Sequence, residues 1–273
     1  MEQFSILLLA FLFGLAIGSF LNVVIIRLPK GESIAYPASH CVRCGTPLKW
    51  YHNIPLLSWL ALRGKCAFCG EPISAQYPLV ELLTALIFAS VFYKLGLSLE
   101  ALLTSLVFTL LLALSLIDLR YKAVPDSINL LALTLAIFAT GDYFESFKDA
   151  LLMAGGFALL RFYVSYYVSK KEELHLKRQL KRAPWLASYY PPYVMIEAMG
   201  EGDIMVAATM GAVLGIKLSL IAIFLAALFA LPASLINRAL KNDKELPFIP
   251  FLALGMYVAF IFQKELLSLI GVA

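Results

Sequence analysis

The sequence predicts an all-α polytopic membrane protein with about eight transmembrane helices and a small cysteine-bearing loop domain after the first helix. Of the 273 residues, 61% are hydrophobic and only 15% are charged, whereas soluble domains carry roughly 25% charged residues. The mean hydropathy of the chain is +0.84. Apolar runs recur along the whole length, and each approaches the roughly 20 residues that a helix needs to cross about 30 Å of hydrocarbon. A membrane domain therefore dominates the protein.

Eight apolar runs are candidates for membrane-spanning helices. In chain order they cover residues 4–26, 79–95, 98–117, 127–141, 147–168, 203–216, 218–236 and 250–270. The first run is too long for the core of a signal peptide and lacks a convincing small-residue cleavage site, so we expect it to be a helix of the mature protein. The run 203–216 is short and begins at an aspartate, as expected for a helix whose first turn lines a polar cavity.

The distribution of Lys and Arg predicts the orientation, because cytoplasmic loops retain positive charge. One side holds Arg27, Lys30, Arg43, Lys49, Arg63, Lys65, Arg120, Lys122, Lys170, Lys171, Lys177, Arg178, Lys181, Arg182, Arg238, Lys241 and Lys244, and the other holds Lys94, Lys148, Lys217 and Lys264. We therefore expect both chain ends outside and the loops 27–78 and 169–202 in the cytoplasm. The chain then divides into a first transmembrane helix (1–26), a cytoplasmic four-cysteine domain (27–78) and a membrane-embedded domain (79–273).

The basic residues do not favour a nucleic-acid partner, because the net charge is only +4 and aromatic residues are not interleaved with them. The charge run within residues 169–182 favours a solvated extension of the preceding helix, with attraction to anionic lipid headgroups as the alternative. The remainder of this loop matches no motif, and we expect it to fold over a functional site or to grip a substrate. Its aromatic residues are Trp185, Tyr189, Tyr190 and Tyr193.

All four cysteines lie in the first cytoplasmic loop, as two Cys-x-x-Cys pairs that are each followed by a glycine. The pairs are Cys41 with Cys44 and Cys66 with Cys69. Two thiolates from each pair can complete a tetrahedral shell around zinc, and the glycine allows the tight turn after the second cysteine. Disulfides are the alternative, which a reducing cytoplasm disfavours. Because no histidine or carboxylate replaces a cysteine, we predict a structural zinc ion in a zinc-ribbon-like domain.

Asp118 and Asp203 are candidates for a reactive pair. An ionisable residue at the centre of a membrane helix costs roughly 2.5–3.5 kcal/mol, so each one needs an explanation. Asp118 ends the third apolar run, and Asp203 opens the sixth directly after Gly200-Glu201-Gly202. The topology, which was derived from Lys and Arg alone, places both on the cytoplasmic side. Two carboxylates close together in a partly dry site share a proton, so one activates water and the other donates to a peptide carbonyl.

Structural explanations stay open for these carboxylates. Asp203 is also consistent with a helix cap, and Asp118 with a residue that faces headgroup water. Asp126 favours an N-cap of the fourth helix over a catalytic role, while Glu81 is equally consistent with a local ion pair and with binding a positively charged substrate segment. We interpret the other charged residues of this region as loop carboxylates and a snorkelling arginine. They are Glu197, Glu201 and Arg161.

Several short motifs, spread over nearly the whole chain, resemble one known family. They are Gly18-Ser19-Phe20-Leu21-Asn22-Val23-Val24, Asn53-Ile54-Pro55-Leu56-Leu57-Ser58-Trp59, Tyr77-Pro78-Leu79-Val80-Glu81, Ile117-Asp118, Val124-Pro125-Asp126, Gly200-Glu201-Gly202-Asp203 and Pro247-Phe248-Ile249-Pro250-Phe251. With the cysteine pairs, they resemble the bacterial type IV prepilin peptidases, which are Gly-x-Gly-Asp membrane aspartyl proteases and N-methyltransferases. By this resemblance Asp118 and Asp203 match the two catalytic aspartates, supported by Gly200 and Gly202.

The resemblance implies an endopeptidase of the bacterial inner membrane that removes the short basic leader from type IV prepilins and pseudopilins, for pilus biogenesis or type II secretion. It makes Glu81 and Asp126 possible substrate-binding residues and residues 79–273 an aspartyl peptidase domain. It also implies methylation of the new N-terminus with S-adenosylmethionine, for which the cysteine domain is a candidate platform. No Gly-x-Gly-x-x-Gly motif follows a predicted strand, so the sequence does not locate a methyl-donor site.

Two other classes of protein remain as alternatives. A transporter or channel also uses intramembrane aspartates, but no inverted repeat is visible and both aspartates lie at one edge of the membrane. A non-catalytic membrane scaffold for pilus assembly would keep the cysteine domain and would tolerate the loss of either aspartate.

Overall fold

The computed structural model describes residues 2–182, 196–197, 200–239, 246–269 and 271. Within these ranges the only regular elements are helices, and two isolated β-bridges lie next to the cysteines. The elements are α1 (Glu2–Arg27), η1 (Leu28–Lys30), η2 (Trp50–Asn53), α2 (Leu57–Ala61), α3 (Gln76–Leu95), α4 (Leu99–Tyr121), α5 (Asp126–Ala139), α6 (Tyr143–Arg182), α7 (Glu201–Ala239), α8 (Ile249–Ile261) and α9 (Gln263–Leu269). The predicted all-α polytopic fold is confirmed.

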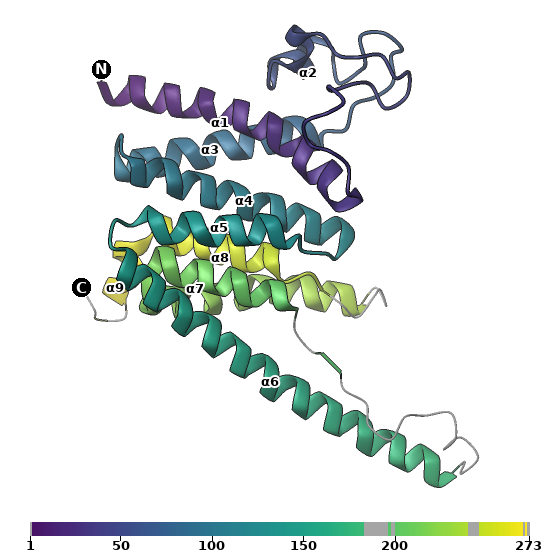
Figure 1. Cartoon of the computed structure of the whole chain (residues 1–273), viewed down its shortest axis with the longest axis vertical. Coiled ribbons are helices and arrows are strands. Elements are labelled where there is room, and N and C mark those ends of the chain that lie inside the picture. The colour runs from purple at the N-terminus through teal and green to yellow at the C-terminus, as the bar shows by residue number, and fades with distance from the viewer. Residues whose placement is uncertain (1, 183–195, 198–199, 240–245, 270, 272–273) are drawn as a thin grey trace.

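Most of the long helices lie side by side in one bundle, and the cysteine-bearing loops sit at one end of it (Figure 1). Helix α6 departs from the bundle towards the same end (Figure 1). It continues to Arg182, so the predicted helical extension over 169–182 is confirmed. The aromatic residues expected to cover a site, from Trp185 to Tyr193, lie outside the described residues.

The expected number of eight membrane spans is not confirmed. In the part of the chain that the structure describes, five helices are long and apolar enough to cross a membrane, and a sixth candidate is the pair α8–α9, which is bent by 88°. Helix α5 is a shorter apolar helix. The predicted runs 203–216 and 218–236 both lie in α7, which is broken at Gly215. Where the structure describes them, the eight predicted runs are thus largely helical, but eight separate spans are not confirmed.

The break in α7 reverses the direction of the chain. Gly215 has φ 70° and ψ 170°, a conformation that a residue with a Cβ adopts only with strain. Both ends of α7 lie towards the end of the bundle that carries the cysteine loops (Figure 1). The part before the break, residues 201–214, is about 21 Å long at 1.5 Å per residue, which is less than the ~30 Å of a hydrocarbon core.

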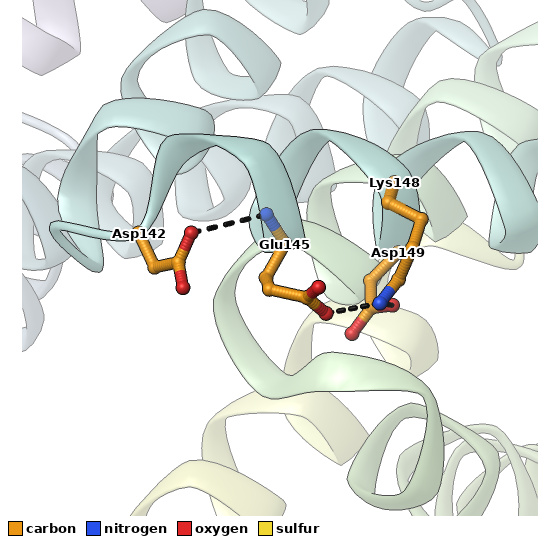
Figure 2. Close-up of polar contacts among 4 residues, drawn as sticks. All are labelled: Asp142, Glu145, Lys148 and Asp149. Carbon is orange, nitrogen blue, oxygen red and sulfur yellow. Dashed lines mark hydrogen bonds and ion pairs between the residues drawn. The ribbon is translucent and has the colours of Figure 1, made fainter.

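Charged residues cluster at the start of α6 (Figure 2), at the end of the bundle away from the cysteine loops (Figure 1). The Asp142 carboxylate accepts a hydrogen bond from the Glu145 backbone N–H at 3.2 Å and so caps this helix. Lys148 pairs with Glu145, and its Nζ lies 3.9 Å from Oδ1 of Asp149. The Asp149 carboxylate in turn lies 3.4 Å from the place that a Cβ on Gly215 would occupy. This cluster therefore packs directly beside the reversal in α7.

Glycines allow the helices to approach each other closely. A Cβ on Gly18 of α1 would lie 2.7 Å from the Glu81 Cα of α3, and a Cβ on Gly211 of α7 would lie 2.4 Å from the Asp149 carbonyl oxygen of α6. Such contacts matter in lipid, where helix association depends on packing and not on exclusion of water. Around them lies a continuous apolar core that includes Phe88, Leu111, Leu114, Ile117, Met210 and Leu252.

We expect Gly211→Ala to lower the stability of the bundle. The added methyl group meets backbone, which cannot move as a side chain can, and such overpacking costs roughly 1–3 kcal/mol. Gly156→Ala on α6 is the matched control, because nothing lies within 4 Å of a Cβ there and alanine favours a helix. Thermal unfolding in detergent measures both. Equal midpoints for Gly211→Ala and the wild type would contradict the packing observed here.

Candidate active site

Asp118 and Asp203 both lie at the end of the bundle that carries the cysteine loops (Figure 1). Asp118 belongs to the last turn of α4 and is 8% exposed. Asp203 is in the first turn of α7 and is half-buried. The two carboxylates are close enough for their charges to interact. The structure therefore brings together two acidic residues that are far apart in the sequence and that lie on different helices.

Each of these carboxylates also faces the beginning of a helix. The Ile249 backbone N–H, in the first turn of α8, donates a hydrogen bond to Asp118. The Gly200 backbone N–H, directly before α7, donates one to Asp203. Helix N-termini carry free N–H groups and a partial positive charge, so they offset part of the cost of placing two acids together. The helix-cap interpretation of Asp203 thus holds alongside its pairing with Asp118.

The turn before Asp203 is packed against the chain that follows α4. A Cβ on Gly202 would lie 2.9 Å from the side chain of Val124. The Gly202 carbonyl oxygen accepts a hydrogen bond from Nδ2 of Asn129 on α5 at 3.1 Å. The sequence did not predict that Val124 or Asn129 holds this turn. The signal that could have found Asn129 is an amide inside an otherwise apolar run.

Arg161 of α6 binds two carboxylates near the same turn. Its guanidinium lies 3.2 Å from Glu197 and 3.1 Å from Glu201. The snorkelling interpretation therefore does not describe this side chain, because it is fixed by specific partners. The segment 196–197 is also held on α6, since the Ile196 N–H donates to the Ser169 hydroxyl at 2.9 Å.

A cavity lies beside Arg161, at the first turn of α7. Its volume is about 270 Å³, and most of its wall is one face of α6. Glu197 and Ile204 complete the wall, so the cavity touches the residue that follows Asp203. The α6 residues of the wall are Ala158, Arg161, Phe162, Ser165, Tyr166 and Ser169.

Glu81 and Asp126, the two possible substrate-binding residues, have different surroundings. Glu81 is 7% exposed, and its carboxylate accepts a hydrogen bond from the Leu56 backbone N–H at 2.8 Å and another from the Ser19 hydroxyl. It therefore joins the cysteine-bearing loop to α1 and α3. Asp126 is exposed and is the first residue of α5, whereas the N-cap is Pro125. The N-cap interpretation of Asp126 is wrong by one residue.

The four cysteines form a candidate metal centre. Their Sγ atoms all lie within 4.8 Å of one another, and none forms a disulfide. The two pairs have the same local structure, because Gly45 donates to the Cys41 carbonyl at 2.9 Å and Gly70 donates to the Cys66 carbonyl at 3.0 Å. Both glycines have a positive φ, of 69° and 72°, as the tight turn after each pair requires.

The sulfur positions fit a tetrahedral ion. A Zn–S bond of about 2.3 Å places neighbouring sulfurs of a tetrahedron about 3.8 Å apart. The Cys41 and Cys69 Sγ atoms lie 3.8 Å apart. Thiolate from all four positions leaves no place for water on the ion, so such a site would stabilise the loops and would not take part in catalysis.

Comparison with known proteins gives two family models that follow each other along the chain. The bacterial peptidase A24 N-terminal domain matches residues 12–95, and the type IV leader peptidase family matches residues 105–235. No solved structure matches the chain.

Curated relatives carry the name prepilin leader peptidase/N-methyltransferase. The one from Xanthomonas campestris is 35% identical over 281 residues, covering 93% of this chain and 91% of that protein. The one from Pseudomonas aeruginosa is 32% identical over 289 residues, covering 96% and 92%. The one from Myxococcus xanthus is 45% identical over 170 residues, which span 60% of this chain and half (50%) of that protein.

We expect the purified protein to contain about one zinc ion per chain, the content of a single four-thiolate site. Cys69→Ser should lose the ion, whereas His40→Ala, which changes an exposed residue beside the first pair, should keep it. Elemental analysis of the detergent-purified protein measures the metal. A wild-type protein without metal, and with its cysteines oxidised to disulfides, would overturn both the zinc site and the cytoplasmic placement of this loop.

We expect Glu81→Leu to loosen the cysteine-bearing loops from α3, because the Leu56 N–H loses its acceptor. A hydrogen bond to a charged group contributes about 1.5–3 kcal/mol, and each 1.4 kcal/mol is tenfold in an equilibrium. Limited proteolysis within residues 27–75 should therefore become about tenfold faster or more, with the zinc content unchanged. Leu82→Ala, an exposed neighbour on α3, is the control. Cleavage at the wild-type rate in Glu81→Leu would show that this contact does not hold the loops.

Proposed function

The chain belongs to the type IV leader peptidase family, and on this premise we propose that it is an aspartic endopeptidase that removes the short basic leader from type IV prepilins and pseudopilins. In relatives of this name the peptidase is joined to N-methyltransferase activity, and we extend that second activity to this chain. The single observation that carries the peptidase assignment is the meeting of Asp118 with Asp203.

The proposed reaction uses the two carboxylates as an acid and a base. With one proton shared between them, the ionised carboxylate takes a proton from water as the water oxygen attacks the scissile carbonyl carbon. The protonated partner donates to the carbonyl oxygen. Collapse of the tetrahedral intermediate then breaks the C–N bond. The leaving nitrogen receives the proton that was taken from water, and the partner carboxylate takes its own proton back from the hydroxyl that becomes the new carbonyl oxygen. Hydrogen bonds from Ile249 and Gly200 hold the two carboxylates in place during these transfers.

The proposed location is the cytoplasmic edge of the bacterial inner membrane. The end of the bundle that holds Asp118 and Asp203 also carries the cysteine loops and the basic extension of α6 (Figure 1), and positive charge favours the cytoplasmic side. A prepilin whose apolar helix enters the bilayer presents its leader at the level of the headgroups. Carboxylates at that level reach the cleavage point without unwinding of the substrate helix in lipid.

Of the two proposed cofactors, zinc is supported by the cysteine geometry and S-adenosylmethionine by the names of the relatives. Four thiolates with tetrahedral spacing fit a structural zinc ion in the domain 27–78. S-adenosylmethionine would supply the methyl group for the new N-terminal amine. Within the described ranges no β-strand precedes a helix in the way that a glycine-rich nucleotide-binding loop requires. We therefore assign no residue to the methyl donor.

We expect Asp118→Asn and Asp203→Asn each to reduce cleavage of a co-purified prepilin by at least about 10²-fold, because each removes a group that moves a proton. Glu100→Gln is the matched control, since Glu100 is exposed in the first turn of α4, at the other end of that helix from Asp118. Mass spectrometry of the prepilin, with and without S-adenosylmethionine, reports cleavage and methylation separately. Normal cleavage by both aspartate variants would leave a transporter or a non-catalytic scaffold as the better explanation.

A further inference from the structure

Asn129 is a buried amide that contacts the turn carrying Asp203. It lies in the first turns of α5 and is 0% exposed. Its side chain contacts the Gly202 carbonyl oxygen at 3.1 Å. A carbonyl oxygen only accepts hydrogen bonds, so the amide nitrogen must face it and the amide oxygen must point elsewhere. The orientation of this side chain is therefore fixed by chemistry.

Burial of the Asn129 amide oxygen lowers the stability of the fold. Oδ1 is buried, and it accepts no hydrogen bond from any residue in the described ranges. A buried acceptor without a partner costs about 1–3 kcal/mol. An apolar side chain of the same size would avoid this cost in a helix whose neighbouring residue, Ile128, is already buried. What the amide adds at this position is its hydrogen bond to the Gly202 carbonyl, next to Asp203.

The contact reaches Asp203 through one rigid peptide unit. The Gly202 carbonyl and the Asp203 Cα belong to the same planar peptide, so holding the carbonyl oxygen orients the backbone from which the Asp203 carboxylate extends. Val124 packs against the Cα of Gly202 and limits movement in a second direction. The start of α5 therefore holds this turn through one hydrogen bond and one steric contact.

We propose that Asn129 is a positioning residue of the peptidase, which sets the orientation of Asp203 towards Asp118 through its hydrogen bond to Gly202. This inference rests on the proposed function. Displacement of a reacting group by about 1 Å is enough to cost 10²-fold in rate, so loss of this contact should affect turnover much more than substrate affinity.

Asn129→Leu tests the proposal against a matched control. The variant removes the hydrogen bond and also removes the unpartnered oxygen, so we expect only a small change in the melting temperature, a kcat lower by about 10- to 100-fold, and a KM within about threefold of the wild type. Asn22 on α1 is the control, because it is also a buried amide. It donates to the backbone carbonyls of Gly18 and Tyr77. Its Oδ1, like that of Asn129, has no hydrogen-bond partner in the described ranges. Asn22→Leu should change the melting temperature and leave the kcat of the folded protein within about threefold.

Asn129→Asp gives a second readout that a purely structural role would not move. The protonated carboxyl group has the shape of the amide and can still donate to the Gly202 carbonyl, whereas the ionised group cannot donate and repels Asp203. We therefore expect cleavage by this variant to be retained at low pH and lost as the pH rises, with the falling limb of its profile at lower pH than in the wild type.

The outcomes separate the two proposals. Wild-type turnover and an unshifted pH profile in the position-129 variants, or losses no larger than in Asn22→Leu, would overturn the positioning role while leaving the peptidase assignment in place. If Asn129→Leu does not fold, the profile of Asn129→Asp decides alone. Failure of the wild-type protein to cleave any prepilin would instead remove the proposed function.

Discussion

Two acidic side chains that must sit together at the edge of a membrane constrain the rest of this bundle. Carboxylates are costly there, and the cost falls only when donors and positive dipoles surround them. The structure supplies both by starting α7 and α8 at the carboxylates, so that Gly200 and Ile249 donate to Asp203 and Asp118. The reversal at Gly215 follows from the same need, because α7 must return to this end of the bundle before α8 can begin there.

The same requirement for partners explains other polar residues of the membrane helices. Hydroxyl groups of Ser105, Thr109 and Ser115 on α4 donate to carbonyls four residues earlier in the same helix, which satisfies them without a second helix. Amides cannot be satisfied in this way alone, and the buried Asn22 and Asn129 each reach a carbonyl of another segment. Buried amides therefore act as fixed links between helices, and one of these links ends beside Asp203.

The sequence predicted the helical fold because apolar runs of spanning length are visible in any single membrane chain. It predicted that Asp118 and Asp203 lie on one side of the membrane, because the positions of Lys and Arg assign a side to every loop. It could not predict how the turn before Asp203 is held, since the partners of Gly202 and Glu201 come from α5 and α6 and depend on packing. The count of eight spans stays unconfirmed, and hydropathy alone does not show the reversal of α7 at Gly215.

Helix α8 links the cysteine-bearing part of the chain to the carboxylates. Its first turn donates to Asp118, and at its other end Lys94 of α3 donates to the carbonyls of Phe260 and Ile261. A carboxylate at the start and a cation at the end both complement the helix dipole. The Ser90 hydroxyl of α3 also bonds to Tyr257 at 2.7 Å. Glu81 of the same helix accepts a hydrogen bond from Leu56, which lies in the cysteine-bearing loop. Helix α3 is therefore fixed both to the loop at Leu56 and to the helix whose first turn donates to Asp118.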